Sequence, residues 1–146
     1  MSYKPCPLCD TAGGTLVWQG PLWRVILAED ADYPAFVRVV WSQHVAEMSD
    51  LSTEHQQLLM NAVFTAESIL RELLQPTKIN LASLGNQVPH LHWHIIPRFD
   101  DDRHFPDPIW AAPRRAASHP LDSGLIGRLK DRLHAAMTQL ASNGGN

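Results

Sequence analysis

The chain has 146 residues, of which 45% are hydrophobic, and 12 Lys and Arg against 15 Asp and Glu give a formal charge of -3. This length and apolar content are enough for one domain with its own core, so we expect a single domain over residues 1–146. The charge balance, without a basic cluster, excludes a broad nucleic-acid surface. The apolar runs are too short for a membrane span or a secretion signal, and we therefore expect a cytoplasmic protein.

Three short strands are predicted in the first third of the chain, over residues 16–18, 23–28 and 36–41. These segments are apolar and rich in β-branched and aromatic residues, and turn-forming residues separate them. Because short turns join the strands, we expect an antiparallel meander.

A long helix follows from Asp50, where apolar residues begin to recur at helical spacing until Pro76 stops the pattern. Ser52 is the expected N-cap, since its hydroxyl can accept a free N–H group of the first turn. Strands are then predicted over 78–82 and 91–97, and a second helix has its apolar positions from residue 121 to residue 140. This order predicts an α+β domain in which a sheet of about five strands is accompanied by one long helix and a C-terminal helix.

Three histidines alternate with apolar residues at the fifth predicted strand: His90 immediately before it, and His92 and His94 within it. A period of two places them on one face, with neighbours about 6.6 Å apart. One histidine on an apolar strand is usually a hydrogen-bonded core residue, but three in register indicate a functional cluster. The spacing leaves two chemistries open, a metal site with a free coordination position or nucleophilic attack by one neutral imidazole.

The flanking residues add a second signal. Two apolar residues and then Pro97-Arg98 follow H-x-H-x-H, and Gly85, Asn86 and Gln87 form a turn upstream. The pattern resembles the histidine triad (HIT) superfamily of nucleotide hydrolases and transferases, from Cys6 to about residue 110. The resemblance implies a HIT-like fold, with a core over about 6–110 and a C-terminal loop and helix over 111–146. It also implies a homodimer and a purine nucleotide substrate.

The resemblance assigns catalytic roles to the three histidines. His92 attacks the α-phosphate of a nucleoside phosphoramidate or dinucleoside polyphosphate and forms a covalent nucleotidyl-histidine. His94, with Asn86 and Gln87, stabilises charge on that phosphate, and His90 orients its neighbours. This chemistry requires no metal, because a neutral imidazole is itself a nucleophile.

Further substrate contacts are expected from residues around this cluster. Small and amide residues suit phosphate oxygens, which makes Asn80 and Gly85 candidates beside Asn86 and Gln87. The resemblance implies that an acidic residue near the second strand binds the ribose. Glu29, Asp30 and Asp32 are candidates, and Asp30 is the one we choose, although an acidic turn is equally often only solvated. Arg98 is a candidate phosphate contact with the same solvated alternative. The resemblance implies that Trp110 lies near the active site or across the dimer.

Cys6 and Cys9 form a C-x-x-C pair. By resemblance to bacterial-type members, they would join His44 and His90 around a structural zinc, and Cys2His2 is sound zinc ligation. The alternative is a pair of ordinary reduced thiols.

Two residues depart from the family pattern. Trp41 stands in place of the usual proline, and Phe36 replaces a histidine that supports the active site in many members. Two other functions therefore stay open, a non-catalytic purine nucleotide-binding module and a metalloenzyme that uses the triad as metal ligands. The resemblance favours the nucleotide hydrolase or transferase.

Overall fold

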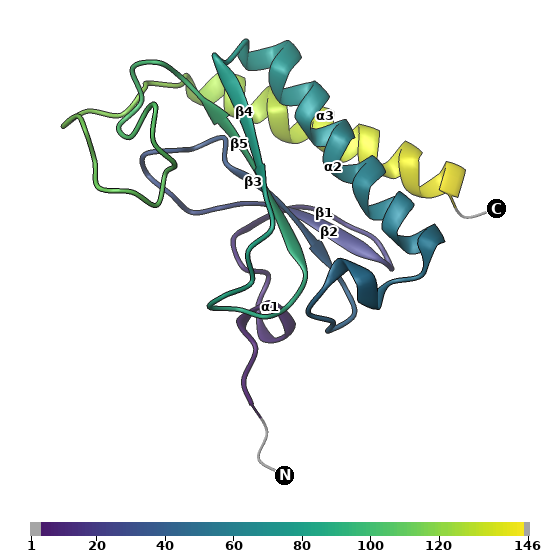
Figure 1. The fold of residues 1–146 in the computed structure, drawn as a ribbon. Helices are drawn as coiled ribbons and strands as arrows, with labels where there is room; N and C mark the ends of the chain where they lie inside the picture. Colours follow the sequence, from purple (N-terminus) through teal and green to yellow (C-terminus); the bar gives the residue numbers. More distant parts are fainter. Residues whose placement is uncertain (1–3, 145–146) are drawn as a thin grey trace.

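The computed structural model describes residues 4–144; residues 1–3 and 145–146 of the expected domain lie outside the described residues. Five strands form one antiparallel sheet in the order β1-β2-β3-β5-β4 (Figure 1). The strands are β1 (Thr15–Gln19), β2 (Trp23–Leu27), β3 (Val37–Trp41), β4 (Lys78–Ala82) and β5 (His92–Arg98). The α+β fold and its five strands are thus confirmed; β4 has the expected bounds, and the bounds of the other strands differ from the expected ones by at most one residue at each end.

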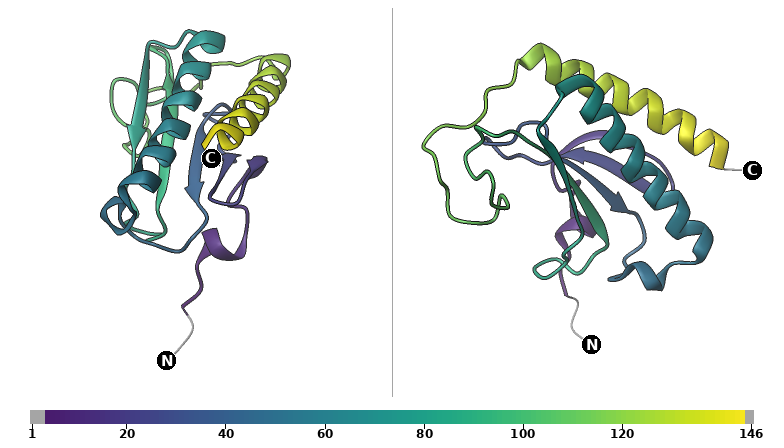
Figure 2. Two further views of the ribbon diagram at one scale, coloured as in Figure 1. Left: turned by 90° about the vertical axis from the view of Figure 1, so that its right-hand side faces the viewer. Right: turned by 45° about the horizontal axis from the view of Figure 1, so that its top comes forward.

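Two helices of 22 residues each lie along one face of the sheet, α2 (Thr53–Leu74) and α3 (Ser123–Gly144) (Figure 2). Ser52 caps α2 as predicted, since its Oγ accepts the N–H of His55 at 3.2 Å. The helix ends at Gln75, whose φ of 48° turns the chain before Pro76. Helix α2 packs on β3 and β5, and α3 packs on α2 and β1. No helix among the described residues has the length and apolar character needed to cross a bilayer.

One short helix was not predicted, α1 (Pro7–Asp10), at the bottom of Figure 1. Four residues carry too little periodicity for a prediction, but Pro7 at the first position favours a helical start. The carbonyl of Cys6 accepts the N–H groups of Cys9 and Asp10. This turn brings the two cysteines to the same side of the chain. A single 3-10 turn (Met48–Asp50) also precedes α2.

The alternation of β5 divides its residues between the two faces of the sheet. Leu91, Trp93 and Ile95 join the core beneath the helices, as expected. His92 and His94 point to the opposite face, which the N-terminal segment covers in part. Arg24 on β2 holds that segment in place, because its guanidinium donates to the carbonyls of Leu8, Thr11 and Ala12 at 2.8 to 3.1 Å.

Candidate functional site

A cleft of about 420 Å³ opens on the face of the sheet opposite the long helices. The N-terminal segment forms one wall, the loop between β4 and β5 forms another, and the strands form the floor. The lining residues are Pro7, Leu8, Gly13, Arg38, Leu84, Gly85, Asn86, Gln87, Val88, His92, His94 and Trp110. Two histidines of the triad therefore lie in the floor of a cavity of ligand size.

His92 is 8% exposed and has a defined orientation. Its Nδ1–H donates to the carbonyl of His90 at 2.6 Å, since a carbonyl can only accept. The neutral ring then carries a lone pair on Nε2, which has no hydrogen-bond partner among the described residues. Burial lowers the pKa of His92, more strongly than the bond to the His90 carbonyl raises it. The neutral, nucleophilic form is therefore the one present at neutral pH.

His94 stands against His92, with ring centroids 4.8 Å apart and the planes nearly perpendicular. Phe36 and Trp110 also contact its ring edge-on, at 5.4 and 5.3 Å. Burial, then His92 and Arg38, lower the pKa of His94 to about 3, so this imidazole is neutral as well. Its tautomer therefore decides whether it donates or accepts in the cleft.

Arg38 is the functional candidate that sequence reasoning missed. It lies on β3 directly opposite His94 on β5, and its Nε–H donates to His94 Nδ1 at 3.3 Å. In the sequence it is a single charge within an apolar strand, a pattern equally typical of an edge position. Only the pairing of β3 with β5, two strands 50 residues apart in the chain, brings it to the triad.

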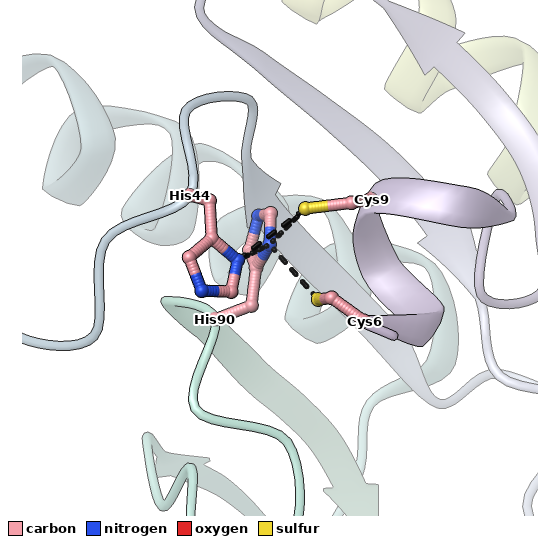
Figure 3. Close-up of side chains that lie close together, drawn as sticks. All are labelled: Cys6, Cys9, His44 and His90. Atoms are coloured by element: carbon pink, nitrogen blue, oxygen red, sulfur yellow. Dashed lines mark hydrogen bonds between the residues drawn. The ribbon is translucent and has the colours of Figure 1, made fainter. Parts of the chain in front are cut away.

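His90 precedes β5, is fully buried and belongs to a second cluster. Its Nδ1 lies 3.5 Å from Cys6 Sγ, 3.4 Å from Cys9 Sγ and 3.3 Å from His44 Nδ1. Figure 3 shows the two sulfurs and the two rings pointing toward one another, from α1, from the loop after β3 and from the residue before β5. All four ligand atoms lie within 4.8 Å of one another. The structure thus brings together the four residues expected to hold zinc.

These distances fit a tetrahedral zinc ion. Zn–S and Zn–N bonds of about 2.3 and 2.0 Å place a sulfur about 3.5 Å from a nitrogen and two nitrogens about 3.3 Å apart. The Nε2–H of His90 donates to the carbonyl of Trp41 at 2.6 Å, which leaves the lone pair on Nδ1 for a metal. Because the backbone of Trp41 makes this bond, the replacement of the usual proline does not remove it.

The same geometry disfavours the triad as a metal-ligand set. The Nδ1 of His90 faces Cys6, Cys9 and His44, and its Nε2 faces the carbonyl of Trp41, so neither nitrogen points toward His92 or His94. The Nδ1 of His92 is bonded to a backbone carbonyl. The three rings therefore do not converge on one point, as three ligands of one ion must.

Four of the predicted substrate contacts line the cleft: Gly85, Asn86, Gln87 and Trp110. Gly85 has φ of 74°, a conformation that a side chain would strain, and it turns the loop toward the cleft. Trp110 remains 52% exposed beside His94, so it presents an aromatic face to an incoming ligand. Ser83 does not line the cleft, but its hydroxyl donates to the backbone carbonyl of His92 at 2.8 Å, an interaction that sequence reasoning missed.

The other three predicted contacts do not line the cleft. Arg98 is 2% exposed, so it is neither solvated nor free for a phosphate; its guanidinium donates to Asp102, to Asn80 Oδ1 and to the carbonyl of Asp107. Asn80 is thereby engaged as well. Asp30 lies in the β2–β3 turn, where its Oδ1 accepts the N–H of Asp32. Arg98 differs from the expectation because it pairs with Asp102. In the sequence, Asp102 is the last of three consecutive aspartates, a pattern typical of a solvated loop, but in the structure its carboxylate is buried.

Known proteins resemble this chain in sequence and in fold. The model of the HIT domain matches residues 12–101. A histidine triad protein from Bradyrhizobium japonicum is 30% identical, with a TM-score of 0.69, covering 84% of this chain and 89% of that one. One from Marinobacter aquaeolei is 28% identical, with a TM-score of 0.72, covering 95% and 98%.

A zinc-bound histidine triad family protein from Mycobacterium smegmatis shares the fold at 19% identity, with a TM-score of 0.62, covering 92% of this chain and 96% of that one. No match was found among curated proteins.

Proposed function

This chain belongs to the HIT domain family, and on that premise we propose that it is a nucleotide hydrolase or nucleotidyl transferase. Its substrate would be a nucleoside phosphoramidate or a dinucleoside polyphosphate, cleaved at the α-phosphate. One observation carries the proposal: His92 donates its Nδ1–H to a carbonyl, and within the described part of the chain its Nε2 lone pair has no partner in a cleft of ligand size. That is the arrangement a nucleophilic imidazole needs.

The proposed reaction has two displacements at one phosphorus atom. The Nε2 lone pair of His92 forms a bond to the α-phosphorus, and the bond from phosphorus to the bridging oxygen or nitrogen breaks, so that the leaving group takes the electron pair and a proton. Water or another acceptor then attacks the same phosphorus, gives up a proton, and releases the P–N bond electrons to His92. Splitting one difficult substitution into two in this way is the benefit of covalent catalysis.

The cleft offers donors for the charge that develops on the phosphate oxygens. The loop of Gly85, Asn86 and Gln87 supplies backbone N–H and side-chain amide groups, and His94 lies beside the nucleophile. Preorganised donors in a partly closed site stabilise such charge more than water does. Trp110 and Leu84, both more than half exposed, provide apolar surface for a purine base.

We also propose a structural zinc held by Cys6, Cys9, His44 and His90. The fit of the four ligand atoms to tetrahedral spacing supports it, as does the zinc in the Mycobacterium smegmatis relative. Zinc here would crosslink α1 to the strands that carry the cleft, apart from the reacting atoms. Cysteine thiolates persist as metal ligands in a reducing compartment, which supports the cytoplasm as the location. The proposed partner is a second copy of the chain.

The test of the catalytic proposal is turnover by the purified protein and by a His92→Asn variant. We expect the native protein to hydrolyse adenosine phosphoramidate or diadenosine polyphosphates, and the variant to lose at least about 1000-fold in kcat, because the nucleophile is gone. AMP should still bind the variant. A matched control is His134→Asn on the exposed side of α3, which should keep native turnover. Full activity in His92→Asn contradicts the mechanism, and binding without turnover in the native protein favours the nucleotide-binding module.

A further inference from the structure

Arg38 lines the cleft and forms no ion pair among the described residues, although the Asp30 carboxylate is close enough to act on its charge. The other buried arginines, Arg24 and Arg98, are each held by three or more acceptors. Its guanidinium lies over the Phe36 ring at 4.9 Å, donates Nε–H to His94, and makes one long contact of 3.5 Å to the Gly13 carbonyl.

The charge on this side chain is permanent. Burial lowers the pKa of Arg38 and the Asp30 carboxylate raises it, and a guanidinium stays protonated in proteins in either case. It carries five N–H groups, of which the contacts above use two. The remaining N–H groups and the positive charge lie in the cavity that holds His92 and His94. A half-buried cation of this kind is a binding site for an anion.

The bond to His94 has a second consequence. Because Arg38 can only donate, Nδ1 of His94 must be the acceptor, and the neutral ring then carries its proton on Nε2. Phe36 packs edge-on against the same ring but has no polar group to set its tautomer. Arg38 therefore does for His94 what the His90 carbonyl does for His92.

We propose that Arg38 is an additional phosphate ligand of this site, which holds His94 as the Nε2–H donor while its own free N–H groups bind an oxygen of the nucleotide phosphate. The inference rests on the proposed function for the identity of the ligand as a nucleotide. It adds a permanent cation to a site whose assigned groups are neutral imidazoles and amides, and so it favours substrates by their phosphate charge. A guanidinium suits this task because its fork matches two phosphate oxygens.

The experiment compares the binding of AMP and of adenosine by calorimetry, since the two ligands differ only in the phosphate. We expect Arg38→Gln to weaken AMP binding by about 10-fold or more, the usual value of a charge-assisted hydrogen bond, and to change adenosine binding by less than about 2-fold. Arg38→Lys keeps the positive charge but loses the forked N–H groups of the guanidinium. Its affinity for AMP should therefore lie between that of the native protein and that of Arg38→Gln. Arg132→Gln, the same change at an exposed ion pair with Glu72 between α2 and α3, is the matched control.

A second readout follows the tautomer directly. In the native protein, the 15N imidazole shifts of His94 should report a bare Nδ1 and a protonated Nε2, and Arg38→Gln should mix the two tautomers. A merely structural arginine moves neither this signal nor the ratio of AMP to adenosine affinity.

The outcomes separate the two proposals. An AMP preference that is equal in native protein and Arg38→Gln, or a proton found on Nδ1 of native His94, overturns the role of Arg38 and leaves the proposed function intact. A native protein that binds neither ligand overturns the proposed function and the phosphate role with it.

Discussion

Buried charge outside the cleft is concentrated at the end of β5, where Arg98 and Asp102 form an ion pair of 2.8 Å with side chains 3% and 1% exposed. Asp102 also accepts the N–H groups of Phe99, His104 and Phe105 and the hydroxyl of Tyr33. Burial by itself raises the pKa of Asp102, but these hydrogen bonds and Arg98 bring it well below the ordinary value. The carboxylate therefore organises the loop that leads to Trp110.

We predict that Asp102→Asn lowers the free energy of unfolding by about 3 to 5 kcal/mol, because it leaves the Arg98 charge buried without its counterion. Urea unfolding monitored by circular dichroism measures the change. Asp107→Asn is the control, since it removes the carboxylate of an exposed pair with Arg114 and should leave stability nearly unchanged. Equal stability of the two variants would contradict a structural role for the buried pair.

The triad and its supporting groups differ in how visible they are at the residue scale. The cluster of three histidines at a spacing of two can be predicted from the sequence, because alternation alone places side chains on one face of a strand. The place of Arg38 beside His94 cannot be predicted in this way, because the two residues lie on different strands and the register between strands is a tertiary property. Arg98 misleads for the same reason: its partners come from a loop that folds back over it.

Among the helices and strands, α1 is the one whose stability we expect to depend most on the proposed zinc. It has only four residues, and isolated helices of this length are not stable in water. Leu8 packs against Ile26 and Val40, Arg24 bonds the carbonyls of this segment, and the proposed zinc would add a further link to the sheet. Of the described residues, this cluster alone groups three or more His, Cys, Asp or Glu side chains at metal-binding distance.

We predict one zinc per chain by metal analysis, lost in Cys9→Ser and retained in His92→Asn. The thermal midpoint of the native protein should fall by several degrees on chelation, because the metal binds only the folded state, and Cys9→Ser should not respond to chelator. A metal that leaves with His92 instead would support the triad as ligand set and contradict the Cys2His2 site.

At the scale of the whole molecule, the two edges of the sheet differ. Helix α3 packs beside β1, where Trp18 Nε1–H donates to Thr138 Oγ1 at 3.2 Å. The other edge, β4, borders a cavity of about 690 Å³ that it shares with Arg98, Phe105 and Trp110. An edge strand presents unpaired backbone groups, which favours pairing with another chain.

We therefore expect a homodimer that uses the β4 edge. Light scattering on the purified protein should give twice the mass of one chain at micromolar concentration. Since Trp110 lines both the cavity at this edge and the cleft of His92 and His94, dilution to monomer should also alter the proposed turnover. A monomeric mass with full activity contradicts the expectation.

The residue pattern alone determined the five strands, the two long helices, the α+β class, the alternation of the three histidines, the Ser52 cap and, through resemblance, the family, because periodicity, capping and motif spacing are local properties of the chain. The tertiary structure decided the rest: the convergence of the four metal-ligating residues, the place of Arg38 against His94, and the withdrawal of Arg98 and Asn80 from the cleft. Each of these depends on contacts between distant segments, which strand register and loop closure set and which no local pattern encodes.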